Sequence, residues 1–186
     1  MIVLGIDPGS RITGYGAIEI VGSERRIVAY GVVKPGNTSS QAMRLALIHE
    51  RLIEILDQIK PDTCAIEMPV YAKNAQSMLK LGRAQAAAML AAMNRQVPIV
   101  EYTPKEIKKA VTGNGNASKE QVWFMVQKIL AINEDRGLDA SDALAISLCH
   151  SQRLGSGGTP ERSHGTWAAF VNANPDRVTK RNPGQS

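Results

Sequence analysis

Cysteine is scarce in this chain, and long apolar runs are lacking. Its two cysteines, Cys64 and Cys149, form no CxxC pair and lie in apolar stretches, which is typical of reduced, buried thiols rather than of disulfides or sulfur metal sites. No stretch approaches about eighteen consecutive apolar residues, and the N-terminus enters an apolar segment without a basic leader. We therefore expect a soluble, cytoplasmic protein with no part in the membrane.

The charge balance is basic, with 22 Lys and Arg against 17 Asp and Glu in 186 residues. A net charge of +5 favours an anionic partner, although it does not separate nucleic acid from general solubility. With 44% hydrophobic residues, the chain can bury one core, and we expect a single domain over residues 1–154. A Gly- and Ser-rich linker then opens a polar segment, 155–186, for which we expect disorder.

Hydrophobic periodicity divides the domain into strand-like and helix-like segments. Strand-like runs occupy 2–6, 12–20, 26–34, 62–66 and 98–102, and helices are expected after Ser39 or Ser40, over 76–95, after Thr103, after Ser118 and over 140–153. The first three strands are joined too closely for anything but hairpins. This order predicts an α/β fold with a five-stranded mixed sheet and helices on both faces. The alanine-rich side of the 76–95 helix predicts close packing, either on its own sheet or against another helix or a second copy.

The first candidate functional residue is Asp7, at the end of the first apolar strand. Pro8 and Gly9 break that strand, because proline lacks a donor and glycine favours turns. In the strand that follows, Gly14 and Gly16 allow another backbone or a ligand to approach closely. A turn-capping aspartate and a functional carboxylate are both compatible with this pattern.

Three further acids stand at the ends of predicted elements. Glu67 ends the 62–66 strand, and Asp139 can cap the last helix with Asp142 on the same side of its first turn. Each has an ordinary explanation as a turn or helix-end residue. Together, however, clustered carboxylates repel one another unless a multivalent cation lies among them, and an all-oxygen donor set favours Mg²⁺ or Mn²⁺. Two such ions about 3.5–4 Å apart would promote phosphodiester hydrolysis.

Five motifs follow one another along the chain: GIDPGSRITGYG, AIEMP, AKNAQSMLKLGRAQ, TGNGNASKEQV and LDASDALAISLCH. Together they closely resemble the motifs of the RuvC family of bacterial Holliday-junction resolvases, and the similarity covers residues 1 to about 153. The resemblance implies a ribonuclease-H-like homodimer that cuts two opposed strands of four-way junction DNA in recombination and repair. It also implies Mg²⁺ as cofactor, two ions per subunit with Mn²⁺ as a substitute, and a branch-migration motor as partner. The acidic tetrad of the family falls on Asp7, Glu67, Asp139 and Asp142.

The resemblance also indicates DNA contacts. The candidate DNA-binding residues are Lys108, Lys119, Tyr71, Lys73 and Arg83. Lys108 and Lys119 match basic positions of the family, although a solvated helix surface explains each lysine equally simply. Just after the catalytic glutamate the family commonly carries an aromatic residue that is thought to act at the opened junction centre. The equivalent position here is Val70, and the adjacent Tyr71 is the candidate to supply a stacking ring.

Two other classes of protein share part of this pattern. A nucleotide-binding module of the actin and sugar-kinase type also begins with Gly-Ile-Asp and a glycine hairpin, but it needs two such domains and this chain has one. A junction-binding protein without catalysis would not need acids at all four positions. Both alternatives are distinguished from a nuclease by a cleavage assay with Mg²⁺ on a synthetic junction.

Overall fold

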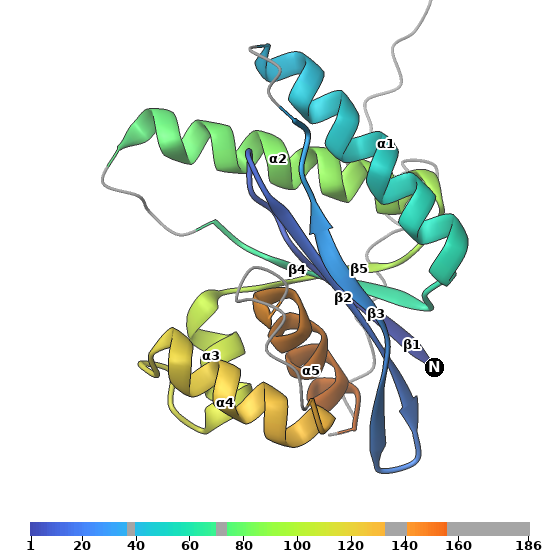
Figure 1. The fold of residues 1–186 in the computed structure, drawn as a ribbon, viewed down its shortest axis with the longest axis vertical. Coiled ribbons are helices and arrows are strands. Elements are labelled where there is room, and N and C mark those ends of the chain that lie inside the picture. Colours follow the sequence, from blue (N-terminus) through green and yellow to red (C-terminus); the bar gives the residue numbers. More distant parts are fainter. Residues whose placement is uncertain (37–39, 70–73, 133–140, 156–186) are drawn as a thin grey trace, which may run out of the picture.

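Five strands form one mixed sheet in the order β3-β2-β1-β4-β5 (Figure 1). The computed structural model describes residues 1–36, 40–69, 74–132 and 141–155. The strands are β1 (Ile2–Asp7), β2 (Thr13–Val21), β3 (Glu24–Val33), β4 (Thr63–Glu67) and β5 (Ile99–Tyr102). β1, β2 and β3 pair antiparallel, whereas β4 runs parallel to both β1 and β5. The predicted meander and the mixed five-stranded sheet are thus confirmed.

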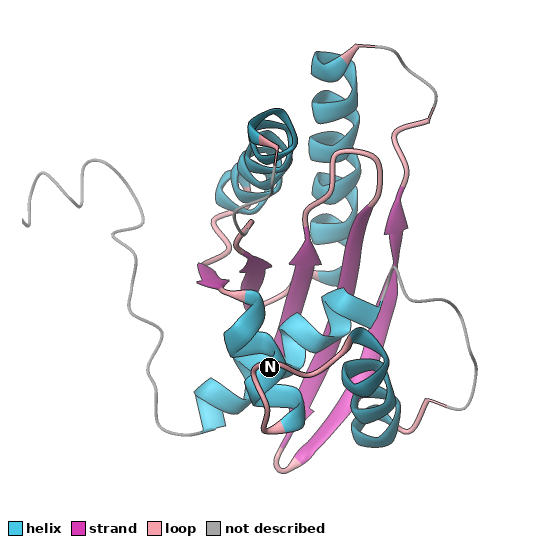
Figure 2. Cartoon of the chain, turned by 90° about the vertical axis from the view of Figure 1, so that its left-hand side faces the viewer, coloured by secondary structure: helices cyan, strands magenta, loops and turns pink. Residues whose placement is uncertain are grey.

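Helices cover both faces of this sheet, as the sequence predicts (Figures 1 and 2). They are α1 (Gln41–Ile59), α2 (Ala75–Asn94), α3 (Pro104–Thr112), α4 (Lys119–Leu130) and α5 (Ser141–Gly155). α1 and α2 lie on one face, and α3, α4 and α5 lie on the other. Ser40 caps α1, and the capping boxes at Thr103 and Ser118 are both formed. In the described part of the chain, no helix has the length and apolarity needed to cross a membrane.

The two-residue period of the strands decides which side chains meet which helices. In β1, Leu4 and Ile6 pack with α1 and α2, while Val3 packs with α3, α4 and α5. In β4, Ile66 likewise faces α1 and α2, and Ala65 faces the other layer. Side chains two residues apart share a face of a sheet. The last residues of β1 and β4 therefore belong to the face that α5 covers.

The alanine-rich side of α2 lies against its own sheet and against α1. Five alanines of α2 are buried, and four of them, Ala84, Ala88, Ala91 and Ala92, pack with side chains of β1, β4 and α1. Small side chains let the helix approach this layer closely. Of the alternatives left open by the sequence, packing on its own sheet and against a neighbouring helix is the one that the structure shows.

Two glycines bring α5 directly onto the sheet. Gly5 and Gly16 are register partners in β1 and β2. A Cβ atom on Gly5 would collide with the carbonyl oxygen of Ala143 and lie 2.7 Å from the backbone nitrogen of Ser147. One on Gly16 would lie 2.8 Å from the backbone nitrogen of Leu144. The close approach predicted for Gly16 is that of a backbone, and Gly5 contributes to it as well.

Both cysteines are free and buried, as expected, and burial raises the pKa of each thiol to about 12. Such thiols stay protonated at neutral pH and are poor nucleophiles and metal ligands. Disorder was predicted for residues 155–186. Of these, 156–186 lie outside the described part of the chain, and Gly155 is the last residue of α5.

Candidate active site

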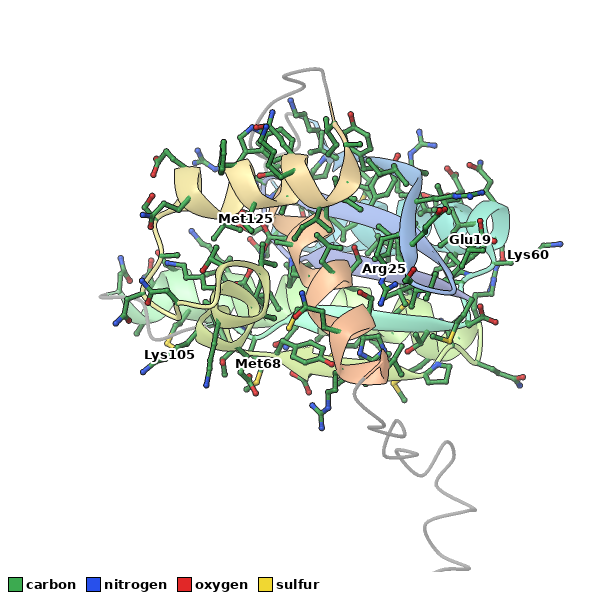
Figure 3. All side chains as sticks on the ribbon, turned by 90° about the horizontal axis from the view of Figure 1, so that it is seen from below. Glu19, Arg25, Lys60, Met68, Lys105 and Met125 are labelled. Carbon is green, nitrogen blue, oxygen red and sulfur yellow. The ribbon has the colours of Figure 1, made fainter. Side chains whose placement is uncertain are left out.

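A pocket of about 330 Å³ opens where β1 and β4 end. Its lining residues are Asp7, Pro8, Glu67, Met68, Pro69, Leu81, Pro104, Ile107, Lys108, Lys119, Val122, Asp142 and Ala145. Three of the four acids predicted as a cluster are therefore in one pocket, together with the two lysines matched to the family. In Figure 3, Met68 and Lys105, from the chain around this pocket, lie toward one side of the molecule, and Glu19 and Lys60 lie toward the other.

The backbone arrangement explains why these three carboxylates converge. β1 and β4 are parallel neighbours with Ile6 opposite Ile66, so Asp7 and Glu67 are the next residues on two adjacent strands. Both belong to the sheet face that α5 covers. Asp142 lies in the first turn of α5, immediately before the residues that contact Gly5. The close packing of α5 on Gly5 of β1 thus places Asp142 at the ends of the two strands.

Glu67 is half-buried, and its ionisation is unfavourable. Burial raises the pKa of its carboxyl group to about 7, and the charges of Asp7 and Asp142 add to this increase. Lys119 and Lys108 act in the opposite direction. Without a further cation, Glu67 is therefore close to half-protonated at neutral pH.

This raised pKa predicts a pH-dependent cost of folding in the metal-free protein. The folded pKa of Glu67 lies above its unfolded value of 4.5, so its contribution to stability is fully present below pH 4.5 and is lost as pH rises through about 7. In chelator, Glu67→Gln should gain stability over wild type across this window, reaching about 3 kcal/mol above pH 7. Urea unfolding at several pH values measures the difference. A difference that does not change between pH 5 and pH 8 would show that Glu67 titrates normally.

Lys119 forms an ion pair with one of the acids. Its Nζ donates to Oδ2 of Asp142 at 2.9 Å, across the gap between the start of α4 and the start of α5. This hydrogen bond raises the pKa of Lys119, and the negative charges of Asp7 and Glu67 contribute as well. Lys119 therefore serves as a counter-ion for the whole group of carboxylates.

The chemistry of the donor set fits a hard divalent cation. The pocket offers three carboxylates and neither Cys nor His, a combination that suits Mg²⁺ or Mn²⁺ better than zinc. Burial and the neighbouring carboxylates raise the pKa of Glu67, so a cation in this pocket would favour its charged form. Among the residues that the structure describes, no three His, Cys, Asp or Glu side chains are placed to hold one ion together. The fourth predicted acid, Asp139, lies outside these residues.

The remaining predicted DNA contacts are placed only in part. Arg83 is exposed on α2 and does not line the pocket, although Leu81 does. Val70, Tyr71 and Lys73 lie outside the described residues. The apolar wall, which includes Ile107 and Val122, was not predicted as part of a site, because inward-facing positions on a helix look the same whether they border a pocket or the core.

A buried histidine on α5 was also not predicted from the sequence. His150 of α5 is 1% exposed, with Nδ1 2.7 Å from the Tyr102 hydroxyl and Nε2 3.2 Å from that of Thr63. Burial lowers its pKa to about 4, so the ring is neutral. The Thr63 hydroxyl is also 3.3 Å from the Pro98 carbonyl oxygen, so it can donate there while it accepts from Nε2. This network ties α5 to β4 and β5 and is structural.

Known proteins resemble this chain over most of its length. Residues 3–150 match the family described as "Crossover junction endodeoxyribonuclease RuvC". Proteins of that name from Salinibacter ruber and Cytophaga hutchinsonii are 52% and 46% identical, covering 97% and 95% of this chain and 100% and 88% of their own. A solved structure, Thermus thermophilus RuvC in complex with a Holliday junction substrate, superposes with a TM-score of 0.79 at 34% identity, covering 85% of this chain and 97% of that one.

Proposed function

The chain belongs to the RuvC family of crossover junction endodeoxyribonucleases and is a Holliday-junction-resolving endonuclease of recombination and repair, and we propose that Asp7, Glu67 and Asp142 form its catalytic centre. Its fold is the ribonuclease-H-like fold of such resolvases. The observation that carries the assignment of the site is the convergence of three carboxylates, from β1, β4 and α5, in one pocket bordered by lysines.

The enzyme is metal-dependent, and we assign its cofactor to these carboxylates. Asp7, Glu67 and Asp142 are the proposed ligands, with Asp139 as a fourth, and the proposed ions are Mg²⁺, two per subunit, with Mn²⁺ as a substitute. When bound, such ions supply an activated water and neutralise charge on the phosphate. Asp7 and Glu67 are presented from adjacent strand ends of a rigid sheet, which fixes the spacing of two donors before any substrate arrives.

The lysines at the rim are suited to the DNA backbone. Lys108 on α3 and Lys119 on α4 both line the pocket, so a phosphate that approaches the carboxylates meets positive charge from two helices. This arrangement supports their assignment as DNA contacts. Tyr71, Lys73 and Arg83 stay in the proposal on the resemblance to the family alone. The Thermus thermophilus relative was solved with a Holliday junction substrate, which makes the same class of ligand appropriate here.

We further propose a homodimer formed through the outer side of α2. Leu79, Leu90 and Met93 are 55%, 54% and 59% exposed, and their spacing places them on one side of the helix. Large apolar side chains exposed together on a helix mark an interaction surface. A twofold pairing would supply the two active sites needed to cut two opposed strands.

Leu90→Glu is expected to shift this dimer to monomers at micromolar concentration, because it buries a charge at a self-complementary contact. Sedimentation velocity measures the change. Met43→Glu provides the control, since Met43 is 55% exposed on α1, and it should remain dimeric. A monomeric wild type, or a fully dimeric Leu90→Glu, would contradict the assignment of this surface.

Two broader features complete the proposal. A branch-migration motor is the expected partner, since a resolvase acts on junctions that such motors move, and the cytoplasm is the expected location. No feature of the described residues points to the motor or to the location. Both rest on membership of the family.

The proposed function is tested by comparing a synthetic four-way junction with a linear duplex of the same sequence. The junction should be cut in two opposed strands when Mg²⁺ is present and should stay intact in chelator. The duplex should remain largely uncut in both. Cutting in chelator would contradict the metal-dependent mechanism, and equal cutting of the duplex would contradict recognition of the junction.

A further inference from the structure

The ion pair between Lys119 and Asp142 joins a proposed DNA contact to a proposed metal ligand. We propose that Lys119 is a displaceable internal cation, which neutralises Asp142 in the metal-free protein and is released toward a DNA phosphate when a divalent ion takes that carboxylate. This inference rests on the proposed function, because it assumes that Asp142 is a metal ligand. It adds an exchange that couples metal binding to DNA binding.

The geometry makes the two cations compete at one carboxylate oxygen. Lys119 Nζ lies 2.9 Å from Asp142 Oδ2, so its ammonium group uses one of the lone pairs through which this oxygen could bind a divalent ion. Two cations at one carboxylate also repel each other. A divalent ion bound at this oxygen therefore weakens the pairing of Asp142 with Lys119, and Lys119 in turn weakens binding of the ion.

The exposure of the two side chains makes the ion pair easy to break and indicates that Lys119 is the residue that moves. The Asp142 side chain is only 26% exposed, whereas that of Lys119 is 69% exposed. An ion pair that is this open to solvent contributes little stability, so it breaks readily. Asp142 stays fixed at the start of α5, and Lys119 extends from the first residue of α4 at the rim of the pocket. Once released, its ammonium group is free to meet a phosphate.

The exchange has two thermodynamic consequences. In the absence of DNA, Lys119 competes with the divalent ion and lowers the metal affinity of the protein. DNA that recruits Lys119 removes this competition, so metal and DNA each strengthen binding of the other by the same factor. The pocket would thus bind its ions best when substrate is present.

The first test is calorimetric titration of Mg²⁺ into the DNA-free protein. Lys119→Met removes the charge and keeps an apolar stem of similar length, and it should bind Mg²⁺ about two- to fivefold more tightly, as expected for removal of an exposed ion pair. Lys108→Met is the matched control, because Lys108 lines the same pocket from α3, and its effect should be smaller. Unchanged or weaker Mg²⁺ binding by Lys119→Met would overturn the proposal.

Asp142→Asn separates this proposal from the one on which it rests. If this variant binds Mg²⁺ as well as wild type, the metal site itself is misassigned. If it binds Mg²⁺ more weakly but Lys119→Met does not bind it more tightly, the metal site stands and the exchange is wrong.

The second test measures junction affinity with and without Ca²⁺, under conditions in which a gel confirms that the junction stays uncut. Ca²⁺ should increase the affinity of wild type by a larger factor than that of Lys119→Met, because only wild type has a lysine to release. For Lys108→Met, affinity should fall by a similar factor in both conditions. Equal enhancement of wild type and Lys119→Met by Ca²⁺ would refute the coupling.

Discussion

Asp7→Asn is expected to abolish junction cleavage while leaving junction binding intact. The amide keeps the shape of the side chain but removes the charge at the end of β1 that helps to hold the ions beside the phosphate. The loss in single-turnover rate should be on the order of 10³-fold or more, since interactions made in the transition state are lost. Affinity for the junction should be unchanged or slightly higher, because one negative charge near the DNA has been deleted.

The same substitution should also change stability. In chelator, Asp7→Asn should melt at a higher temperature than wild type, because fewer carboxylates repel one another around Glu67. Added Mg²⁺ should raise its melting temperature less than it raises that of wild type. Cleavage near the wild-type rate would refute the role of Asp7 as a metal ligand. A variant that neither folds nor binds would show that Asp7 is a structural turn residue.

Among the substitutions considered, Gly5→Ala is expected to lower the free energy of unfolding the most. Its Cβ would collide with the Ala143 carbonyl oxygen and lie 2.7 Å from the Ser147 nitrogen, and both are backbone atoms that no change of rotamer can move. Either α5 shifts away from the sheet or β1 bends. Overpacking of a core costs about 1–3 kcal/mol, and this rigid contact should reach at least the upper end of that range.

Urea unfolding of Gly5→Ala should be compared with that of Gly82→Ala. Gly82 lies within α2, and a Cβ there would meet nothing within 4 Å, so alanine should leave stability unchanged or raise it by about 0.5–1 kcal/mol. Because Asp142 immediately precedes Ala143, any Gly5→Ala protein that still folds should also cut junctions more slowly. Wild-type stability of Gly5→Ala would mean that α5 does not rest on β1 in this way.

The fold was largely predictable from the sequence because its signals are local. Two capping boxes, the turn glycines and the periodicity of each apolar run determine where elements begin, and all ten predicted elements are present. The acids were also recognisable, since Asp7 and Glu67 each end an apolar strand. Their convergence follows from parallel pairing of β1 and β4, which the connecting helix α1 allows.

Other features depend on long-range contacts that carry no local signal. Gly5 has the strand-interior position that marks close approach, but the sequence does not say which backbone approaches it. The pairing of Lys119 with Asp142 spans 23 positions, and that of His150 with Thr63 spans 87. A lysine on a helix surface and a lone histidine look ordinary until tertiary structure gives them partners.

The site assignment is tested most directly by the single-turnover rate of junction cleavage by Glu67→Gln in saturating Mg²⁺. Glu101→Gln is the control, since Glu101 lies on the neighbouring strand β5, is exposed and accepts a hydrogen bond from Gln85. If Asp7, Glu67 and Asp142 form the metal site, Glu67→Gln should bind the junction and lose cleavage by on the order of 10³-fold, while Glu101→Gln cuts at the wild-type rate. Cleavage by Glu67→Gln at a rate close to that of Glu101→Gln would contradict this assignment.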